Sequence, residues 1–166
     1  MGRMLDPSTL GDHIDRLYRA ACALTGNRVA ADDLVQETYA RVLAKPRRIT
    51  AGDDVGYLVR TMRNVFLDQR RQQTRRATDS VDPETFDRVE AGGLGGAPNP
   101  QVAAEQREMM SFISGLPEDF RDVLVAVDVA GLSYKEASDA LGVPEGTIMS
   151  RLYRARKRVV TAFPAG

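Results

Sequence analysis

Residues 132–152 read LSYKEASDALGVPEGTIMSRL, and this stretch decides the fold class of the second half of the chain. A short helix over Tyr134–Leu141 would carry the small residue Ala137 at the place where a second helix must cross closely. Gly142 then allows a turn, and Pro144 suits the first turn of a following helix because its missing N–H would have no partner there. The pattern predicts two helices joined by a tight turn, the arrangement called a helix-turn-helix.

The second helix of this motif, which we expect to run to about Phe163, has two chemically different sides. Its apolar positions recur at helical spacing and predict a buried stripe of Ile148, Leu152, Ala155 and Val159. About 100° around the helix axis lies a polar and cationic stripe without carboxylates, which consists of Thr147, Ser150, Arg151, Arg154 and Arg158. Such a helix suits the major groove of DNA, where its first turns read bases and its later arginines contact phosphates. The alternative is an ordinary amphipathic helix with a solvated basic side.

Five further helices are predicted, three of them in the first half of the chain, from apolar residues spaced three and four positions apart. The first is expected to end at Gly26, with inward residues Leu10, Ile14, Leu17, Ala21 and Leu24. The second covers residues 28–44, with inward residues Ala31, Leu34, Val35, Thr38 and Val42. The third runs from about residues 52–54 to Arg76, with inward residues Val55, Leu58, Val59, Met62, Val65 and Phe66. Helices over residues 106–116 and 118–130 are expected on either side of Pro117. The predicted fold class is all-α.

Charge is distributed unevenly, although 23 basic and 23 acidic residues cancel over the whole chain. Residues 60–76 hold six arginines and one aspartate, and residues 147–158 hold five basic residues and no acid. Residues 77–106 hold six acids, one arginine and the run GGLGGAPNP, a composition that predicts a flexible linker. Two basic faces on separate helical segments favour a polyanion contacted at two places, and two solvated helix faces are the alternative.

The composition argues against several classes of function. A single cysteine, Cys22, cannot form an internal disulfide, and a single histidine, His13, removes most zinc sites and acid–base triads. We expect both to be packing or surface residues, and we predict no cofactor, no metal and no catalytic residue. No apolar run approaches the roughly 20 residues of a membrane helix. We therefore expect a soluble, cytoplasmic protein without membrane insertion.

Five motifs of the chain resemble those of the extracytoplasmic-function (ECF, or group four) bacterial sigma factors of the sigma-70 family. In the first half the resemblance rests on ADDLVQETY at 31–39 and YLVRTMRNVFLDQRR at 57–71. In the second half it rests on LPEDFRDVL at 116–124, GLSYKEA at 131–137 and GTIMSRLYRAR at 146–156. Generic helix-turn-helix proteins share only the second half, so both halves in this order are more specific than either one.

This resemblance implies two small helical domains joined by a flexible linker. A sigma-two domain would cover residues 8–76, an acidic linker residues 77–105, and a sigma-four helix-turn-helix domain residues 106–163. The chain would then be a subunit of RNA polymerase that directs promoter recognition and transcription initiation, and not an enzyme. The implied partners are the beta-prime clamp helices and beta flap of core polymerase, promoter DNA, and an anti-sigma factor that keeps the protein inactive until a signal arrives.

The resemblance also assigns roles to residues that match the family's motifs. The residues expected to bind the clamp helices are Asp33, Gln36 and Glu37. Those expected at the minus-ten promoter element are Tyr57, Arg60, Asn64, Asp68 and Arg71, with Asp68 more suited to orienting an arginine than to touching DNA. Those expected at the minus-35 element are Thr147, Ser150, Arg151, Arg154 and Arg158.

Three other interpretations of the sequence stay open. A stand-alone helix-turn-helix repressor or activator would bind duplex DNA without polymerase and would usually be a dimer. A sigma mimic would capture an anti-sigma factor without touching DNA. An enzyme could use the doublets Asp32-Asp33 and Asp53-Asp54 to hold a metal, although acids at helix starts mainly interact favourably with the helix dipole.

Overall fold

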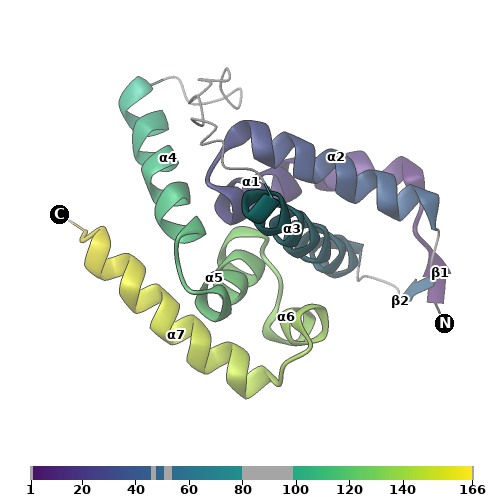
Figure 1. Cartoon of the computed structure of the whole chain (residues 1–166). Helices are drawn as coiled ribbons and strands as arrows, with labels where there is room; N and C mark the ends of the chain where they lie inside the picture. The colour runs from purple at the N-terminus through teal and green to yellow at the C-terminus, as the bar shows by residue number, and fades with distance from the viewer. Residues whose placement is uncertain (1, 46–47, 51–53, 80–98, 166) are drawn as a thin grey trace.

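Helices make up most of this computed structural model, which describes residues 2–45, 48–50, 54–79 and 99–165. The first lobe contains the 3-10 helix η1 (Pro7–His13) and the helices α1 (Ile14–Thr25), α2 (Arg28–Ala44) and α3 (Asp54–Asp79). The second lobe contains α4 (Pro100–Ser114), α5 (Glu118–Leu124), the π-helix η2 (Val125–Val129), α6 (Tyr134–Leu141) and α7 (Glu145–Ala162). The predicted all-α fold class is confirmed (Figure 1). The sequence pattern did not indicate one addition, the short antiparallel pair of strands β1 (Gly2–Met4) and β2 (Arg48–Thr50).

The helix ends follow the local signals in the sequence. Gly26 ends α1 with a φ of 69°, a left-handed conformation that favours glycine, and Gly142 ends α6 with the same φ. Asn27 begins α2, since its side-chain oxygen accepts hydrogen bonds from the next helical N–H groups. Ser133 and Glu136 form a reciprocal capping box at the start of α6. The predicted helix-turn-helix is therefore confirmed as α6, a turn at residues 142–144, and α7.

The predicted apolar stripes of α2 and α3 form the core of the first lobe. Leu34, Leu58 and Met62 are completely buried where α2 packs on α3. The other predicted inward residues of these two helices are also buried, at 9% exposure or less. Burying a leucine or methionine side chain stabilises a fold by about 1.5–3 kcal/mol, so these stripes hold the lobe together.

Helix α1 is buried on two sides, which its sequence pattern did not predict. Ile14, which was expected to point inward, is 46% exposed, whereas five consecutive residues near the end of the helix are buried: Ala20, Ala21, Cys22, Ala23 and Leu24. The cause is that α2 and α3 cover one side of α1 while α4 and η2 of the second lobe cover another. A pattern with one apolar stripe indicates only one covered side, so it misses a neighbour from the other lobe.

Two helices extend into the segment that we expected to be a linker. Helix α3 continues to Asp79, and α4 begins at Pro100 instead of residue 106. The early start of α4 has a local cause, because the Asn99 side chain caps the helix and proline suits its first position. The rest of the predicted linker, residues 80–98, lies outside the described residues, as does the start predicted for α3 at residues 52–53.

The two lobes pack directly against each other, with α1 against α4 and η2, and α3 against α6 (Figure 1). One close contact lies at Gly26, where an added Cβ would be 2.5 Å from the Ser114 hydroxyl oxygen. An added Cβ at Gly26 would therefore make the Ser114 side chain shift, and the backbone conformation independently favours glycine. The sequence predicted two lobes joined by a tether, and the extensive contact between them is a finding of the structure.

Candidate nucleic-acid interface

Helix α7 presents the polar side that the sequence predicted. Its inner side packs on α5 and α6 through Ile148, Leu152 and Ala155, which are buried. Ser150 and Arg154 are exposed on the outer side, and Thr147 is half-buried beside them. The Ser150 hydroxyl donates to the carbonyl oxygen of Thr147 at 3.1 Å. Ser150 and Arg154 are therefore open to solvent on the outer side of α7.

The arginines on one flank of α7 also contact α5. Arg151 lies 3.6 Å from the carboxylate of Asp119, and the guanidinium of Arg158 stacks over the ring of Phe120 at 4.8 Å. Both residues therefore sit at the boundary between the outer side of α7 and the α5 side. The structure brings Thr147, Ser150, Arg151 and Arg154 together, and it places Arg158 farther along the helix against an aromatic ring.

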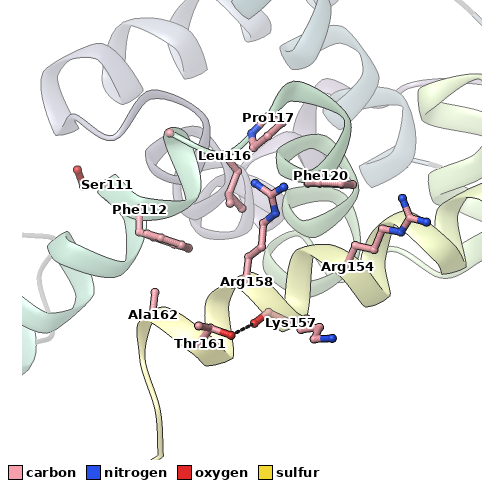
Figure 2. Close-up of a pocket in the computed structure, with 11 residues that line it drawn as sticks. Ser111, Phe112, Leu116, Pro117, Phe120, Arg154, Lys157, Arg158, Thr161 and Ala162 are labelled. Atoms are coloured by element: carbon pink, nitrogen blue, oxygen red, sulfur yellow. Dashed lines mark hydrogen bonds between the residues drawn. The ribbon is translucent and has the colours of Figure 1, made fainter.

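An apolar groove of about 870 Å³ runs between α4, α5 and α7, with cations along one edge. Figure 2 shows the rings of Phe112 and Phe120 and the side chain of Leu116 on one side, and basic side chains of α7 on the other. The basic residues are Arg154, Lys157 and Arg158. Part of the predicted cationic stripe therefore lines this groove as well as the outer side of the helix.

Two exposed side chains on α7 were missed by the sequence analysis. Tyr153 is 70% exposed and Met149 is 54% exposed, four positions apart and next to Arg154 and Ser150. Large apolar side chains left in water mark contact surfaces, and apolar groups can contact the methyl group of thymine. The signal was present in the sequence, because neither residue falls on the predicted buried stripe. We add Met149 and Tyr153 to the candidate DNA-contacting surface on the outer side of α7.

Helix α3 presents a second polar side, opposite its buried stripe. Arg60 and Asn64 are exposed one helical turn apart, and Arg71 is exposed two turns further along. Tyr57 is partly buried and its carbonyl oxygen accepts a hydrogen bond from Thr61. Arg60 and Asn64 are thus open to solvent on the side of α3 opposite its buried stripe.

Asp68 contacts arginines and is not an isolated carboxylate. Its oxygens lie 3.0 Å from Arg41 of α2 and 3.6 Å from Arg71 of α3. This geometry fits the expectation that Asp68 orients an arginine. A carboxylate between two guanidinium groups also lowers the local excess of positive charge between α2 and α3.

The flank of α3 that faces the second lobe is engaged by α5. Arg63 donates to Asp122 at 2.7 Å and to Glu118 at 3.4 Å. The guanidinium of Arg121 lies 4.9 Å from the ring centre of Phe66, and that of Arg70 lies 5.4 Å from the same ring. Arg63 and Arg70 belong to the basic segment 60–76, and the structure shows that Arg63 binds the neighbouring helix α5 whereas Arg70 covers a ring of its own helix.

The three residues expected to bind core polymerase share the exposed side of α2. Asp33, Gln36 and Glu37 are exposed, while Leu34 and Val35 between them are buried. Glu37 also lies 3.7 Å from Arg41, one turn along the same helix. The structure brings the three together on α2, and Arg41 links this surface to α3 because it also lies 3.0 Å from Asp68.

The structure shows the surroundings of Cys22 and His13, which we expected to be packing or surface residues. Burial raises the pKa of the Cys22 thiol, which keeps it protonated and unreactive at neutral pH. His13 lies 4.0 Å from the carboxylate of Asp54.

Over the described part of the chain, no group of three or more His, Cys, Asp or Glu side chains is placed to hold a metal ion. The helices in that part include none that is both long and apolar enough to cross a membrane.

The fold and its exposed surfaces define a two-lobed, mainly helical protein that carries a helix-turn-helix. Residues 10–76 match the family Sigma-70 region 2, and residues 106–159 match the family Sigma-70, region 4. The chain is 38% identical to the ECF RNA polymerase sigma factor SigE of Mycolicibacterium smegmatis over 89% of its length, and it spans 57% of that relative. It is 34% identical to the ECF RNA polymerase sigma factor EcfG of Rhodopseudomonas palustris, over 88% of this chain and 78% of the relative. The chain belongs to the ECF RNA polymerase sigma factor family.

Two solved structures share the arrangement of the whole chain. The sigma factor RpoE of Bartonella quintana, solved in complex with the anti-sigma factor NepR, superposes with a TM-score of 0.72 at 26% identity and 93% coverage of both chains. CnrH, solved with the cytosolic domain of CnrY, superposes with a TM-score of 0.61 at 20% identity, over 93% of this chain and 84% of CnrH. The match to RpoE covers residues of both lobes.

Proposed function

We propose that this chain binds core RNA polymerase in the cytoplasm and directs it to promoters that carry two separate recognition elements. In this proposal α3 contacts the minus-ten element and α7 contacts the minus-35 element. The observation that carries it is the presence of one exposed polar side on each lobe of a chain in the ECF sigma factor family. The chain contributes binding and orientation, and the polymerase carries out the chemistry.

On α7, Arg151 and Arg154 are proposed to contact guanine or phosphate, with Thr147 and Ser150 in the first turns of the helix. A guanidinium can donate two hydrogen bonds to guanine, which is worth about 1–3 kcal/mol of discrimination against another base. Arg158 stacks on Phe120, and we assign it a phosphate contact at the edge of the interface.

On α3, Asn64 is proposed to contact a base of the separated strand, because its amide offers both a donor and an acceptor. Arg60 and Arg71 would neutralise the strand on either side of it, and Tyr57 would offer a stacking surface. Capture of an unpaired base offsets an unstacking cost of a few kcal/mol, so strand opening needs no catalytic side chain from this protein.

Two protein partners complete the proposal. Asp33, Gln36 and Glu37 would bind the beta-prime clamp helices of polymerase, and the second lobe would contact the beta flap. An anti-sigma factor is proposed as the regulator, with support from the similarity to RpoE, which was solved with NepR.

A mobility-shift assay with and without core polymerase tests this function against the two non-enzymatic alternatives. We expect a promoter fragment to shift only when chain and core are both present, and run-off transcripts to start from it. Replacing Asn64 with Ala should lower transcript yield, whereas Arg107→Ala on the exposed side of α4 should not. A shift by the chain alone would favour a stand-alone regulator, and no shift under any condition would favour a sigma mimic.

A further inference from the structure

The first turn of α5 lies along one flank of the candidate DNA-reading helix α7. Asp119 in this turn places its carboxylate 3.6 Å from the guanidinium of Arg151, and the ring centre of Phe120 lies 4.8 Å from the guanidinium of Arg158. Arg151 and Arg158 are seven positions apart, so they lie on the same side of α7, about two helical turns from each other. One turn of α5 therefore contacts two of the arginines that we assign to the minus-35 element.

The contact between Asp119 and Arg151 is an ion pair without a hydrogen bond. The 3.6 Å between nitrogen and oxygen exceeds the usual range of a hydrogen bond, about 2.7–3.2 Å. Among the described residues, the guanidinium of Arg151 donates no hydrogen bond, whereas that of Arg156 on another flank of α7 donates two to Asp128. Arg151 is thus restrained by a carboxylate while its N–H donors stay available for another partner.

A restrained arginine suits base recognition better than a mobile one. Two hydrogen bonds to guanine require the planar guanidinium to point in one direction, and fixing a mobile side chain on binding weakens the contact. The side chain of Arg151 is only 31% exposed and has its acidic neighbour on α5. Arg154 is exposed on the same helix, and no acidic partner is found for it among the described residues. Of these two arginines, Arg151 therefore has the more restricted side chain.

The charge of Asp119 also affects which group of DNA Arg151 can contact. The side chain of Asp119 is 67% exposed, so its carboxylate lies at the surface beside the guanidinium. A phosphate drawn toward Arg151 would be repelled by this carboxylate, whereas the edge of guanine is uncharged and offers two acceptors. Asp119 therefore disfavours a phosphate contact at Arg151 more than a base contact.

We propose that Asp119 is a positioning residue, which sets the base preference of Arg151 in the minus-35 element without itself touching DNA. This inference rests on the proposed function and specifies how one position of the element is read. Removing the carboxylate would release the Arg151 side chain and permit phosphate contacts, so binding would become less selective without becoming weaker. Loss of a residue that binds DNA directly would instead weaken binding.

The test measures base preference with the holoenzyme formed from core polymerase and the full chain. The template is a promoter to which the wild-type chain directs core polymerase, with its upstream element randomised, and the templates that the holoenzyme retains are sequenced. Asp119→Asn removes the carboxylate beside Arg151, and Asp139→Asn is the matched loss of one charge from the exposed side of α6. Arg151→Ala identifies the position of the element that Arg151 reads.

We expect Asp119→Asn to lower base discrimination at that position by about two- to fivefold, the range that exposed ion pairs provide, and to leave other positions unchanged. Asp139→Asn should change no position, and Asp119→Asn should have no further effect on base preference when combined with Arg151→Ala.

Three results would overturn the proposal. They are equal base preferences in Asp119→Asn and Asp139→Asn, an effect of Asp119→Asn that persists in the combination with Arg151→Ala, and the lack of any position that depends on Arg151. A wild-type chain that directs core polymerase to no promoter would instead refute the proposed function.

The mobility of the arginine side chains tests the same contact without polymerase or DNA. Nuclear magnetic resonance relaxation of the arginine Nε groups reports motion on the picosecond-to-nanosecond timescale, and Arg151→Lys and Arg154→Lys would assign the two signals. We expect a higher order parameter for Arg151 than for Arg154 in the wild-type chain. In Asp119→Asn the order parameter of Arg151 should fall to the level of Arg154, and in Asp139→Asn it should not. An order parameter of Arg151 that Asp119→Asn leaves unchanged would overturn the proposal.

Discussion

Arg156 and Asp128 are joined by two hydrogen bonds of 2.7 and 2.9 Å, which tie α7 to the π-helical turn before α6. The hydrogen bonds that Arg156 donates to the Asp128 carboxylate raise the pKa of the guanidinium above its ordinary value. In the sequence, Arg156 is one of five basic residues in the segment 147–158. The structure gives it a role within the fold, on the flank of α7 away from Arg151.

We predict that Asp128→Asn destabilises the second lobe and leaves base preference unchanged. Exposed ion pairs contribute about 0.2–1 kcal/mol, and the two parallel hydrogen bonds place this pair near the upper end of that range. Urea denaturation of wild type and variant would measure the loss, which should shrink at high salt. An altered promoter preference at unchanged stability would show that Arg156 contacts DNA.

Alanine substitutions at two glycines should separate backbone strain from contact between the lobes. Gly26 and Gly142 share a φ of 69°, so either alanine costs about 1–2 kcal/mol in the stability of its lobe. An added Cβ at Gly142 meets nothing within 4 Å, whereas at Gly26 it meets Ser114 of the other lobe. We expect only Gly26→Ala to raise the radius of gyration. An equal effect of both variants on that radius would contradict the lobe contact.

Base readout by α7 should depend on some of its cations and not on others. Arg151→Ala is expected to relax discrimination at one position of the upstream element by about 1–3 kcal/mol. Lys157→Ala, on the edge of the apolar groove, should weaken binding of all sequences alike. Competition for polymerase holoenzyme between promoter variants would measure both effects. If Arg151→Ala leaves base preference unaltered, Arg151 is not one of the residues that read bases of the minus-35 element.

The Cys22 thiol should react slowly, and its rate should keep rising at high pH. Because burial raises its pKa, the thiolate fraction at pH 8 is smaller than that of an ordinary cysteine. We expect slow labelling by a thiol reagent in the native chain and fast labelling in urea. The labelling rate of the native chain should still increase above pH 9, which is the ordinary pKa of the thiol. A plateau at or below pH 9 would contradict the raised pKa of Cys22.

Local signals predicted most of the helices, because their causes lie within a few residues. The bounds of α2 and α6, the stop at Gly26 and the buried stripe of α3 follow from caps, glycine and apolar spacing. The exposed positions of Arg60, Asn64 and Ser150 follow in the same way, since a helix with one covered side presents the opposite side to solvent.

Contacts between the lobes were not predictable from the same signals. In the sequence, Arg63 is only one of six arginines in the basic segment 60–76, and the placement of α5 shows that it binds Asp122 and Glu118. The burial of Cys22 and the exposure of Ile14 likewise depend on which neighbour covers α1. Periodicity within one helix carries no information about a partner that arrives from a distant part of the chain.

The most direct test of promoter selection is to map transcript start sites on genomic DNA of the source organism, using core polymerase with and without this chain. We predict start sites that appear only with the chain and share two upstream elements at a constant spacing. Those sites should lose their common upstream element when Thr147 and Arg151 are both replaced by alanine. An identical set of start sites with and without the chain would contradict its assignment as the promoter-selecting subunit.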